Sequence, residues 1–381
     1  MSFGVYLDYN ATAPIRPEAE EAAVCALRLG GNPSSVHATG RIARAAVEMA
    51  RDQVAALVGA RPAEVTFTSG GTEANALAIG SAAIAGARKP IVAMVEHDSV
   101  MQNALATGLE VQGWPVDRSG IADLDWLRAR LALWNAADGP PFAALALANN
   151  ETGVIQPIAD VAAILHDAGG WLHVDAVQAA GKIPVDMDTL GADTLALSAH
   201  KLGGPMGSGA LVAGPRAKIA RLLHGGGQER GHRSGTENVS GIAGFGAAAA
   251  AAQRDLPQFG VQAAWRDAVA RRLAETTGAE IVGADAPRLA NTLCIATPGW
   301  ESALQVMALD LAGVRISGGA ACSSGKVSPS HVLTAMGLDD LAACAARASG
   351  GWGTRESDWT VFAEAWLEAH ARHIARRREV A

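Results

Sequence analysis

The stretch DTLALSAHKLGGPMGSGAL (193–211) places one lysine, Lys201, directly after an apolar run and ahead of several glycines. The run from Thr194 to Leu197 predicts a strand that is covered on both faces, as in a parallel sheet. Glycines allow the backbone to approach another group closely. A lysine on a solvated loop needs neither feature. We therefore expect Lys201 at the edge of a buried site, where partial desolvation favours a nucleophilic amine.

The composition limits the classes of protein to which this chain can belong. The chain has 381 residues, 49% hydrophobic and 18% charged, which is an ordinary globular balance and long enough for two domains. The net charge of −7 argues against a nucleic-acid partner, which needs a cationic surface. The most apolar stretch, 241–252, is too short to cross a bilayer, so we expect no membrane partner.

The cysteines indicate a reducing environment and one reactive thiol. Cys25, Cys294, Cys322 and Cys344 are widely spaced and form no C-x-x-C pair, so we expect no metal site, no disulfide framework and a cytoplasmic location. Buried cysteines usually act as inert hydrophobes, and we expect this of all except Cys322. Cys322 lies in the Gly/Ser-rich stretch RISGGAACSSGKVSPSHVL (315–333), where an exposed, mobile thiol suits a nucleophile.

Short apolar runs alternate with longer helical patterns through the first two thirds of the chain. This alternation predicts an α/β fold with a mostly parallel central sheet. The expected strands lie at 64–69, 90–95, 143–148, 170–175 and 193–198, and the expected helices at 72–86, 98–108, 123–134 and 158–168.

The last third of the chain has a different pattern. An alanine-rich helix over 236–275 is expected to act as a long connector, and a strand at 291–296 and helices near 301–312, 330–336 and 356–378 follow it. We therefore expect a large domain over 16–258. A smaller α+β domain should combine 1–15 with 259–381 and carry the Cys322 loop.

Polar signatures follow each expected strand of the sheet. They are TSGGTEAN (68–75), EHDS (96–99), NNETG (149–153), VDAVQ (174–178) and SAHK (198–201). Ligands of open parallel sheets bind at the carboxyl ends of the strands. The five signatures therefore predict one site.

Gly70, Gly71 and Thr72 stand between an expected strand and an expected helix. Backbone N–H groups at such a helix start can bind an anion. The plainer alternative is a tight turn in which Thr72 caps the helix, and the residues alone leave both open. The stretch matches neither a Walker loop nor a dinucleotide-binding fingerprint.

Asp175 and Lys201 follow two expected neighbouring strands. A carboxylate at the buried end of a strand is costly unless a cation pairs with it, and a protonated pyridine nitrogen is such a cation. That pairing turns pyridoxal phosphate into an electron sink, and a lysine can form a Schiff base with its aldehyde. The alternative for Asp175 is to cap the following helix.

Five further side chains are expected around the same ligand. Ser198 and His200 can donate to its phosphate, and Asn150 and Gln178 can donate to its ring oxygen. His97 can stack on the ring face, although a lone histidine is more often structural.

Taken together, these motifs resemble those of the cysteine desulfurases, which are fold-type I pyridoxal-phosphate-dependent transferases of the class V aminotransferase superfamily. The resemblance runs from YLDYNATAP (6–14) to ARASGG (346–351). Its most specific pieces are GNPSSVH (31–37), FTSGGTEANALAI (67–79), EH (96–97), NNETG (149–153), HVDAVQAAGK (173–182), SAHKLGGPMGSGAL (198–211), HGGGQERGHRSGT (224–236) and GAACSSG (319–325).

The resemblance implies a role for each candidate residue. Lys201 carries the cofactor as a Schiff base, and Asp175 pairs with its ring nitrogen. The phosphate is held by Gly71, Thr72, Ser198, His200 and, across a homodimer interface, Thr236. Asn150 and Gln178 bind the ring hydroxyl, and Asn32 and Arg347 bind the substrate carboxylate.

The implied reaction converts L-cysteine to L-alanine and leaves the sulfur as a persulfide on Cys322. Because the attack needs a thiolate, and an unshifted cysteine is mostly protonated at neutral pH, we expect a nearby base, His97, to assist. The loop ACSSGKVSPSHVL (321–333) is similar to that of the long-loop group, which serves iron–sulfur cluster assembly. The expected partners are therefore L-cysteine, a second copy of the chain, and a sulfur-acceptor or iron–sulfur scaffold protein.

Three other functions stay open: a selenocysteine lyase, a class V aminotransferase and a catalytically silent sulfur-relay subunit. Cys322 argues against a simple aminotransferase, which needs no nucleophile. The presence of both Lys201 and Asp175 argues against a silent subunit. The chain departs from the family pattern at Trp352, where a second arginine is common, and at Met206, where lysine is frequent.

Overall fold

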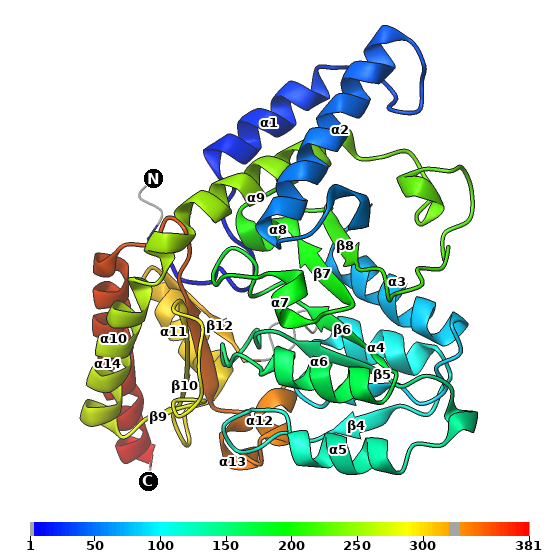
Figure 1. The fold of residues 1–381 in the computed structure, drawn as a ribbon. Helices are drawn as coiled ribbons and strands as arrows, with labels where there is room; N and C mark the ends of the chain where they lie inside the picture. Colours follow the sequence, from blue (N-terminus) through cyan, green and yellow to red (C-terminus); the bar gives the residue numbers. More distant parts are fainter. Residues whose placement is uncertain (1–3, 320–327, 381) are drawn as a thin grey trace.

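The structure is a computed structural model that describes residues 4–319 and 328–380. A seven-stranded sheet with helices on both faces forms the larger part, and a smaller unit of helices and short strands stands beside it (Figure 1). The expected α/β class with a mostly parallel central sheet is confirmed. Among the described residues, no helix has the length and apolar character needed to cross a membrane. Cys322 lies outside the described residues, and its role stays a prediction.

The central sheet brings the carboxyl ends of six strands to one edge. Its strand order is β2 (Val65–Thr68), β8 (Gly209–Ala213), β7 (Thr194–Ser198), β6 (Trp171–Asp175), β5 (Phe142–Ala146), β3 (Ile91–Ala93) and β4 (Gln112–Trp114). The strands from β7 to β4 are parallel, whereas β8 runs antiparallel to both β7 and β2. Because two reversals restore the direction, β2 ends at the same edge as the parallel strands.

Helices cover both faces of this sheet because successive strand residues point to opposite sides. On one face, Phe142 and Ala144 of β5 pack in a core with α3 (Gly71–Ile84) and α4 (Asp98–Ala106). On the other face, Ala143 and Leu145 share a core with four further helices. These are α2 (Ala38–Leu57), α5 (Leu124–Ala132), α6 (Ile158–Asp167) and α9 (Val239–Phe259). The same unit contains α1 (Pro17–Leu27), α7 (Met187–Leu190) and α8 (Ala199–Leu202).

The smaller unit is built on a four-stranded sheet. Its order is β12 (Ser317–Gly318), β13 (Ala345–Ser349), β10 (Thr292–Ala296) and β9 (Glu280–Ile281), and β1 (Val5–Tyr6) pairs with β11 (Val314–Arg315) nearby. The helices α10 (Gln262–Thr277) and α14 (Glu356–Val380) pack together at the left of Figure 1. The unit also contains α11 (Ser302–Leu311). The helices α12 (His331–Ala335) and α13 (Asp339–Ala342) instead contribute Val332, Leu333 and Leu341 to the core of the central sheet. The division into domains at residues 16 and 259 stays a prediction.

Most expected elements are confirmed, and one is wrong. The strands β2, β3, β5, β6 and β7 and the helices α3 to α6 lie where the apolar patterns predict them. The single helix expected over 236–275 is two helices, because α9 ends at Phe259 and α10 begins at Gln262. Pro257 weakens the last turn of α9 because it has no N–H to donate. The two helices also have different neighbours, since α9 packs on α1 and α2 and α10 packs on α14.

Gly209, the first residue of β8, passes close to the start of α3. A Cβ built on Gly209 would lie 2.6 Å from the Cα of Gly70 and 2.7 Å from the carbonyl oxygen of Leu197. No side chain fits there unless the backbone moves. Gly209, one of the glycines that follow Lys201, therefore allows the close approach of β8 to the turn between β2 and α3.

We predict that Gly209→Ala lowers the free energy of unfolding by about 1–3 kcal/mol, because the added methyl group overpacks this contact. Urea denaturation of the purified variant measures the change. Gly260→Ala is the control, since a Cβ at Gly260 meets no atom within 4 Å, and its effect should stay within about 0.5 kcal/mol. Equal stability of the two variants would contradict the packing argument.

Candidate active site

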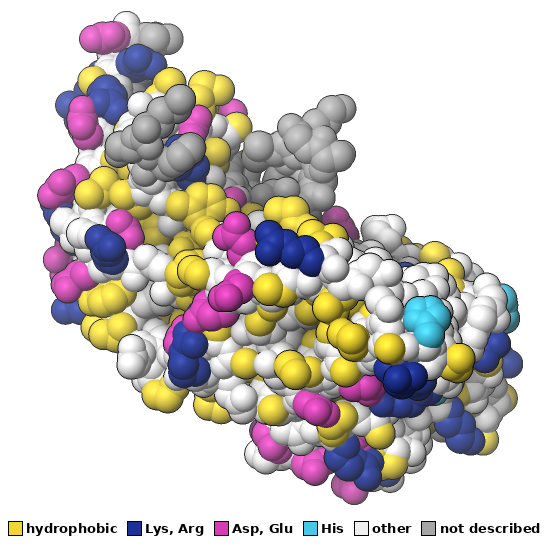
Figure 2. Space-filling view, turned by 90° about the horizontal axis from the view of Figure 1, so that it is seen from above, with side chains coloured by type: hydrophobic (Ala, Val, Ile, Leu, Met, Phe, Trp, Pro, Cys, Tyr) yellow, Lys and Arg dark blue, Asp and Glu magenta, His cyan; other side chains and the backbone are white. Residues whose placement is uncertain are grey.

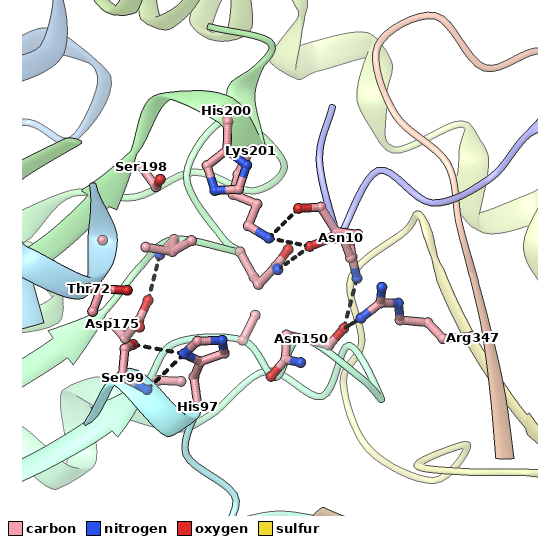
Figure 3. Close-up of a pocket in the computed structure, with 16 residues that line it drawn as sticks. Asn10, Thr72, His97, Ser99, Asn150, Asp175, Ser198, His200, Lys201 and Arg347 are labelled. Carbon is pink, nitrogen blue, oxygen red and sulfur yellow. Dashed lines mark hydrogen bonds between the residues drawn. The ribbon is translucent and has the colours of Figure 1, made fainter. Parts of the chain in front are cut away.

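A cavity of about 360 Å³ lies at the carboxyl edge of the central sheet (Figure 3). Its lining includes Gly71, Thr72, His97, Asn150, Asp175, Gln178, Ser198, His200, Lys201 and Arg347, all of which the sequence analysis singles out. Six lining residues are additional: Asn10, Ala11, Ser99, Ala146, Ala148 and Val177. The strand ends thus converge on one cavity, and the N-terminal segment and β13 close it from the side of the smaller unit.

Two predicted residues lie away from this cavity. Thr236 lines a separate small pocket with Arg233. Asn32 is exposed, and its side-chain oxygen accepts a hydrogen bond from the Ser34 amide at 2.8 Å. The prediction for Thr236 invokes a second copy of the chain, and the single chain gives Asn32 no position beside Arg347.

The start of α3 lies at one end of the cavity. This is the end where the sequence predicts that an anion binds. Gly70 is the N-cap and offers no side chain, so Thr72 lies within the first turn. The alternative in which Thr72 caps the helix is therefore wrong. A Cβ on Gly71 would lie 2.9 Å from Val177 Cγ2, so α3 can start this close only with glycine. A helix start without a side-chain cap leaves its backbone N–H groups available to an anion.

Ser198 and His200 stand beside this anion end. Ser198 ends β7, and His200 lies in α8 with its Nδ1 atom 3.1 Å from Thr12 Oγ1. Burial, with the nearby charge of Lys201, lowers the pKa of His200 to about 4. The imidazole is therefore neutral at neutral pH and can bind a phosphate through a hydrogen bond rather than as a cation.

Asp175 closes β6 and is held by two donors. Its Oδ1 atom accepts from the Val177 amide at 2.9 Å, and Oδ2 accepts from Asn75 Nδ2 at 2.8 Å. The chain forms a turn over 177–182, and the next helix is α7, so the first bond closes a turn and the alternative in which Asp175 caps a helix is wrong. Asp175 lines the cavity.

A chain of hydrogen bonds connects Asp175 with His97 through Asn75 (Figure 3 shows its His97 end). Asn75 Nδ2 also donates to Ser99 Oγ at 2.9 Å. The Ser99 hydroxyl therefore directs its own proton to His97 Nδ1, 2.8 Å away, and the Ser99 amide donates to the same nitrogen at 3.0 Å. Because Nδ1 accepts, the proton of a neutral His97 is on Nε2.

His173 fixes the other end of this chain. Its Nε2 lies 2.9 Å from Asn75 Oδ1, and its Nδ1 lies 2.9 Å from Thr194 Oγ1. Burial lowers the pKa of His173 to about 4, so the ring is neutral and donates its one proton to Asn75. Sequence analysis misses Asn75, although one signal exists: it is a polar residue one turn after Gly71 in a helix of mostly small, apolar residues.

Lys201 is anchored by the N-terminal segment. Its Nζ atom donates to the carbonyl oxygens of Asn10 at 2.6 Å and Ala11 at 2.7 Å. Asn10 Nδ2 in turn donates to the carbonyl oxygen of Asn150 at 3.2 Å. No spacing in the sequence signals the contact between Lys201 and Asn10, because 191 positions separate the two residues.

Arg347 brings a cation from β13 into the cavity. It is 1% exposed, donates from Nη1 to the Asn150 carbonyl at 3.1 Å, and pairs through Nη2 with Asp8 at 2.8 Å. Trp352, which replaces the second arginine of the family pattern, does not line this cavity. Its indole donates to the Pro14 carbonyl at 2.9 Å. Arg347 is therefore the arginine that can meet a ligand carboxylate here.

Glu96 is a buried acid next to His97. Its Oε1 atom accepts from the Ala146 amide, and Oε2 has no partner among the described residues. Burial and the negative charge of Asp175 raise the pKa of Glu96 to about 8. Glu96 is therefore protonated at neutral pH and places no second negative charge behind Asp175.

Known proteins similar to this chain share one family. The family model described as Aminotransferase class-V matches residues 5–358. The chain belongs to this family. A cysteine desulfurase from Cereibacter sphaeroides is 42% identical over 94% of this chain and 92% of its own length. An IscS-like cysteine desulfurase from Mycobacterium tuberculosis is 37% identical over 99% and 98%. The X-ray structure of a NifS-like protein from Rickettsia africae has a TM-score of 0.89 at 32% identity, covering 97% of this chain and 99% of that one.

Family members depend on pyridoxal phosphate, so the expected cofactor is confirmed. The residues of the cavity fit this group. An amine (Lys201), a carboxylate (Asp175) and an uncapped helix start (Gly71) line the same space. These are the partners that an aldehyde, a pyridine nitrogen and a phosphate require.

We predict that Glu96→Gln changes how stability depends on pH. In the wild type, Glu96 keeps its proton up to about pH 8 when folded but loses it near 4.5 when unfolded, so stability falls as pH rises between these values. The neutral glutamine removes this fall. Urea unfolding should give similar stabilities near pH 5, and the variant should be more stable by at least about 1 kcal/mol at pH 8.

Glu110→Gln is the control for this measurement. Glu110 has a side chain that is 66% exposed, so its replacement should leave the pH dependence unchanged. If the stability of Glu96→Gln changed with pH in parallel with that of the wild type, the result would contradict the claim that Glu96 is buried and protonated.

Proposed function

We propose that this chain is a pyridoxal-phosphate-dependent cysteine desulfurase, which converts L-cysteine to L-alanine and leaves the sulfur as a persulfide on Cys322. One observation carries the proposal. Lys201, Asp175 and the uncapped start of α3 line one cavity, in a chain whose relatives at 37–42% identity are named cysteine desulfurases.

Different lining residues bind different parts of the cofactor in this proposal. We assign its phosphate to Gly71, Thr72, Ser198 and His200, its ring nitrogen to Asp175, and its ring hydroxyl to Asn150 and Gln178. Bound pyridoxal phosphate supplies an aldehyde that forms imines with amines and a ring that withdraws electrons from the substrate carbon.

Two side chains move protons in this proposal. The Lys201 amine, anchored on Asn10 and Ala11, would hold the cofactor and would take the proton from the substrate Cα. The His97 ring faces the cavity (Figure 3). Its neutral tautomer carries the proton on Nε2 and offers a hydrogen bond to the cavity, so we assign proton donation to the imidazolium form of His97 rather than the base role expected from the sequence.

Arg347 is the residue to which we assign the substrate carboxylate, because a guanidinium binds a carboxylate with two parallel hydrogen bonds. The segment that carries Cys322 begins after β12, and Ser317 of β12 pairs with Arg347 of β13. The Cys322 thiolate attacks the substrate sulfur, so an S–S bond forms as the C–S bond breaks. The carbon fragment keeps the electron pair and takes up a proton to become L-alanine.

We further propose that the active protein is a cytoplasmic homodimer that passes sulfur to an acceptor or iron–sulfur scaffold protein. Thr236 and Asn32 lie away from the cavity of their own chain, and a second copy would give them a site to complete. Large hydrophobic side chains are exposed on α1 and α2, with Leu27 at 69%, Ile42 at 55% and Met49 at 64%. Figure 2, seen from the side where these helices project in Figure 1, shows hydrophobic side chains among charged ones. Such a surface supports contact with another protein.

We predict that Cys322→Ala abolishes sulfide release from L-cysteine and keeps cofactor binding. The cofactor is held by Lys201 and the other cavity residues, whereas Cys322 acts only when the C–S bond breaks. The measurement follows the cofactor spectrum, sulfide and alanine after the variant is mixed with L-cysteine and a reductant.

Cys25→Ala is the matched control, because Cys25 is an exposed cysteine in α1, and it should retain full activity. Alanine production at the wild-type rate by Cys322→Ala would contradict the proposed sulfur transfer. A keto acid product from the wild type would instead favour an aminotransferase.

A further inference from the structure

Lys182 is a buried lysine next to the active site, and the proposed reaction does not use it. It lies in the turn after β6 and is 6% exposed. Its amine contacts amide oxygens, and no carboxylate of the described residues lies within ion-pair distance. Burial, with the charges of Lys201 and Arg347, lowers the pKa of Lys182 well below its ordinary value. A buried amine without an acid is costly, so its presence calls for a function.

The amine of Lys182 holds two side-chain amides by their oxygens. Nζ donates to Gln178 Oε1 at 2.7 Å and to Asn10 Oδ1 at 2.9 Å. Each amide must then use its nitrogen elsewhere. Gln178 Nε2 donates to the Asn10 carbonyl at 2.9 Å, and Asn10 Nδ2 donates to Thr292 Oγ1 at 2.9 Å.

This arrangement decides what Gln178 presents to a ligand. An amide has one acceptor and one donor end, and a flipped Gln178 would point its oxygen at the Asn10 carbonyl and its nitrogen at an amine. The Lys182 amine and the Asn10 carbonyl together therefore disfavour the flipped state. Gln178 lines the cavity, and its second amide N–H remains for a ligand oxygen.

The same contacts reach Lys201. The Asn10 carbonyl that accepts from Gln178 also accepts from Lys201 Nζ, at 2.6 Å. Both lysines thus contact Asn10, Lys182 at its side chain and Lys201 at its backbone. A change at Lys182 is transmitted to the cavity through Asn10 and Gln178.

We propose that Lys182 is a positioning residue for the cofactor: its amine fixes the amide of Gln178 so that this side chain offers an N–H donor to the cofactor's ring hydroxyl. This inference rests on the proposed function, which supplies the cofactor. It gives Lys182 no contact with the cofactor and no part in bond breaking.

A double-mutant cycle tests the inference through cofactor affinity. Pyridoxal phosphate is titrated into the cofactor-free wild type, Lys182→Met, Gln178→Leu and the double variant, and absorbance gives each dissociation constant. We expect Lys182→Met and Gln178→Leu each to weaken binding about tenfold, the loss of one good hydrogen bond. The double variant should bind no more weakly than Gln178→Leu, because Lys182 acts through Gln178.

Lys89→Met is the matched control, since Lys89 pairs with Asp138 on the surface, and its affinity should equal that of the wild type. Wild-type affinity in Lys182→Met, or losses that multiply in the double variant, would overturn the inference. A wild type that binds no pyridoxal phosphate would overturn the proposed function as well.

A second variant covers the case in which Lys182→Met does not fold. Gln178→Glu keeps and strengthens the contact with Lys182 but removes the N–H donor. It should weaken binding of pyridoxal phosphate at least as much as Gln178→Leu. Wild-type affinity in Gln178→Glu would overturn the inference without reference to Lys182→Met.

Discussion

The backbone carbonyl of Asn10 is the contact on which the active site depends. It accepts hydrogen bonds from Lys201 and Gln178, so the N-terminal segment holds two side chains that belong to the large sheet and its loops. The side chain of Asn10 reaches into the smaller unit, where it contacts Asn291 and Thr292. Lys201 can be held in this position only when both units are folded against this segment. The site is therefore a product of the whole chain rather than of one strand end.

Burial keeps three titratable groups at or next to the cavity neutral. The pKa values of His173 and His200 fall to about 4, and that of Glu96 rises to about 8, each chiefly because burial penalises the charged form. The remaining anion, Asp175, faces the cavity with its orientation fixed by Asn75 and the Val177 amide. A pyridine nitrogen that meets the Asp175 carboxylate is favoured in its protonated form.

Much of the fold and of the cavity lining could be predicted from the sequence, because parallel strands place their carboxyl ends at one edge. Apolar runs that end in polar signatures therefore locate Asp175, His97 and the start of α3 together. The antiparallel strand β8 escapes such a prediction because it begins at Gly209 in a glycine-rich stretch. The break between α9 and α10 escapes it because the alanine-rich pattern continues through Pro257.

The supporting residues of the site could not be predicted in the same way. Asn10 and Lys182 are 172 positions apart, and their contact depends on how the N-terminal segment packs beside the cavity. Asn75 lies in a quoted motif, but its link to His173 requires the packing of α3 on β6. Neither Thr236 nor Asn32 lines the cavity of its own chain, and the role predicted for Thr236 requires a second copy.

The most direct test of this account is to identify the lysine that binds the cofactor. Borohydride reduction of the wild-type protein loaded with pyridoxal phosphate converts the imine into a stable secondary amine, and mass spectrometry of the peptides locates the added group. The account predicts one modified site, Lys201, in the peptide that joins β7 to β8. Modification of Lys182 or of a surface lysine, with Lys201 unmodified, would contradict it.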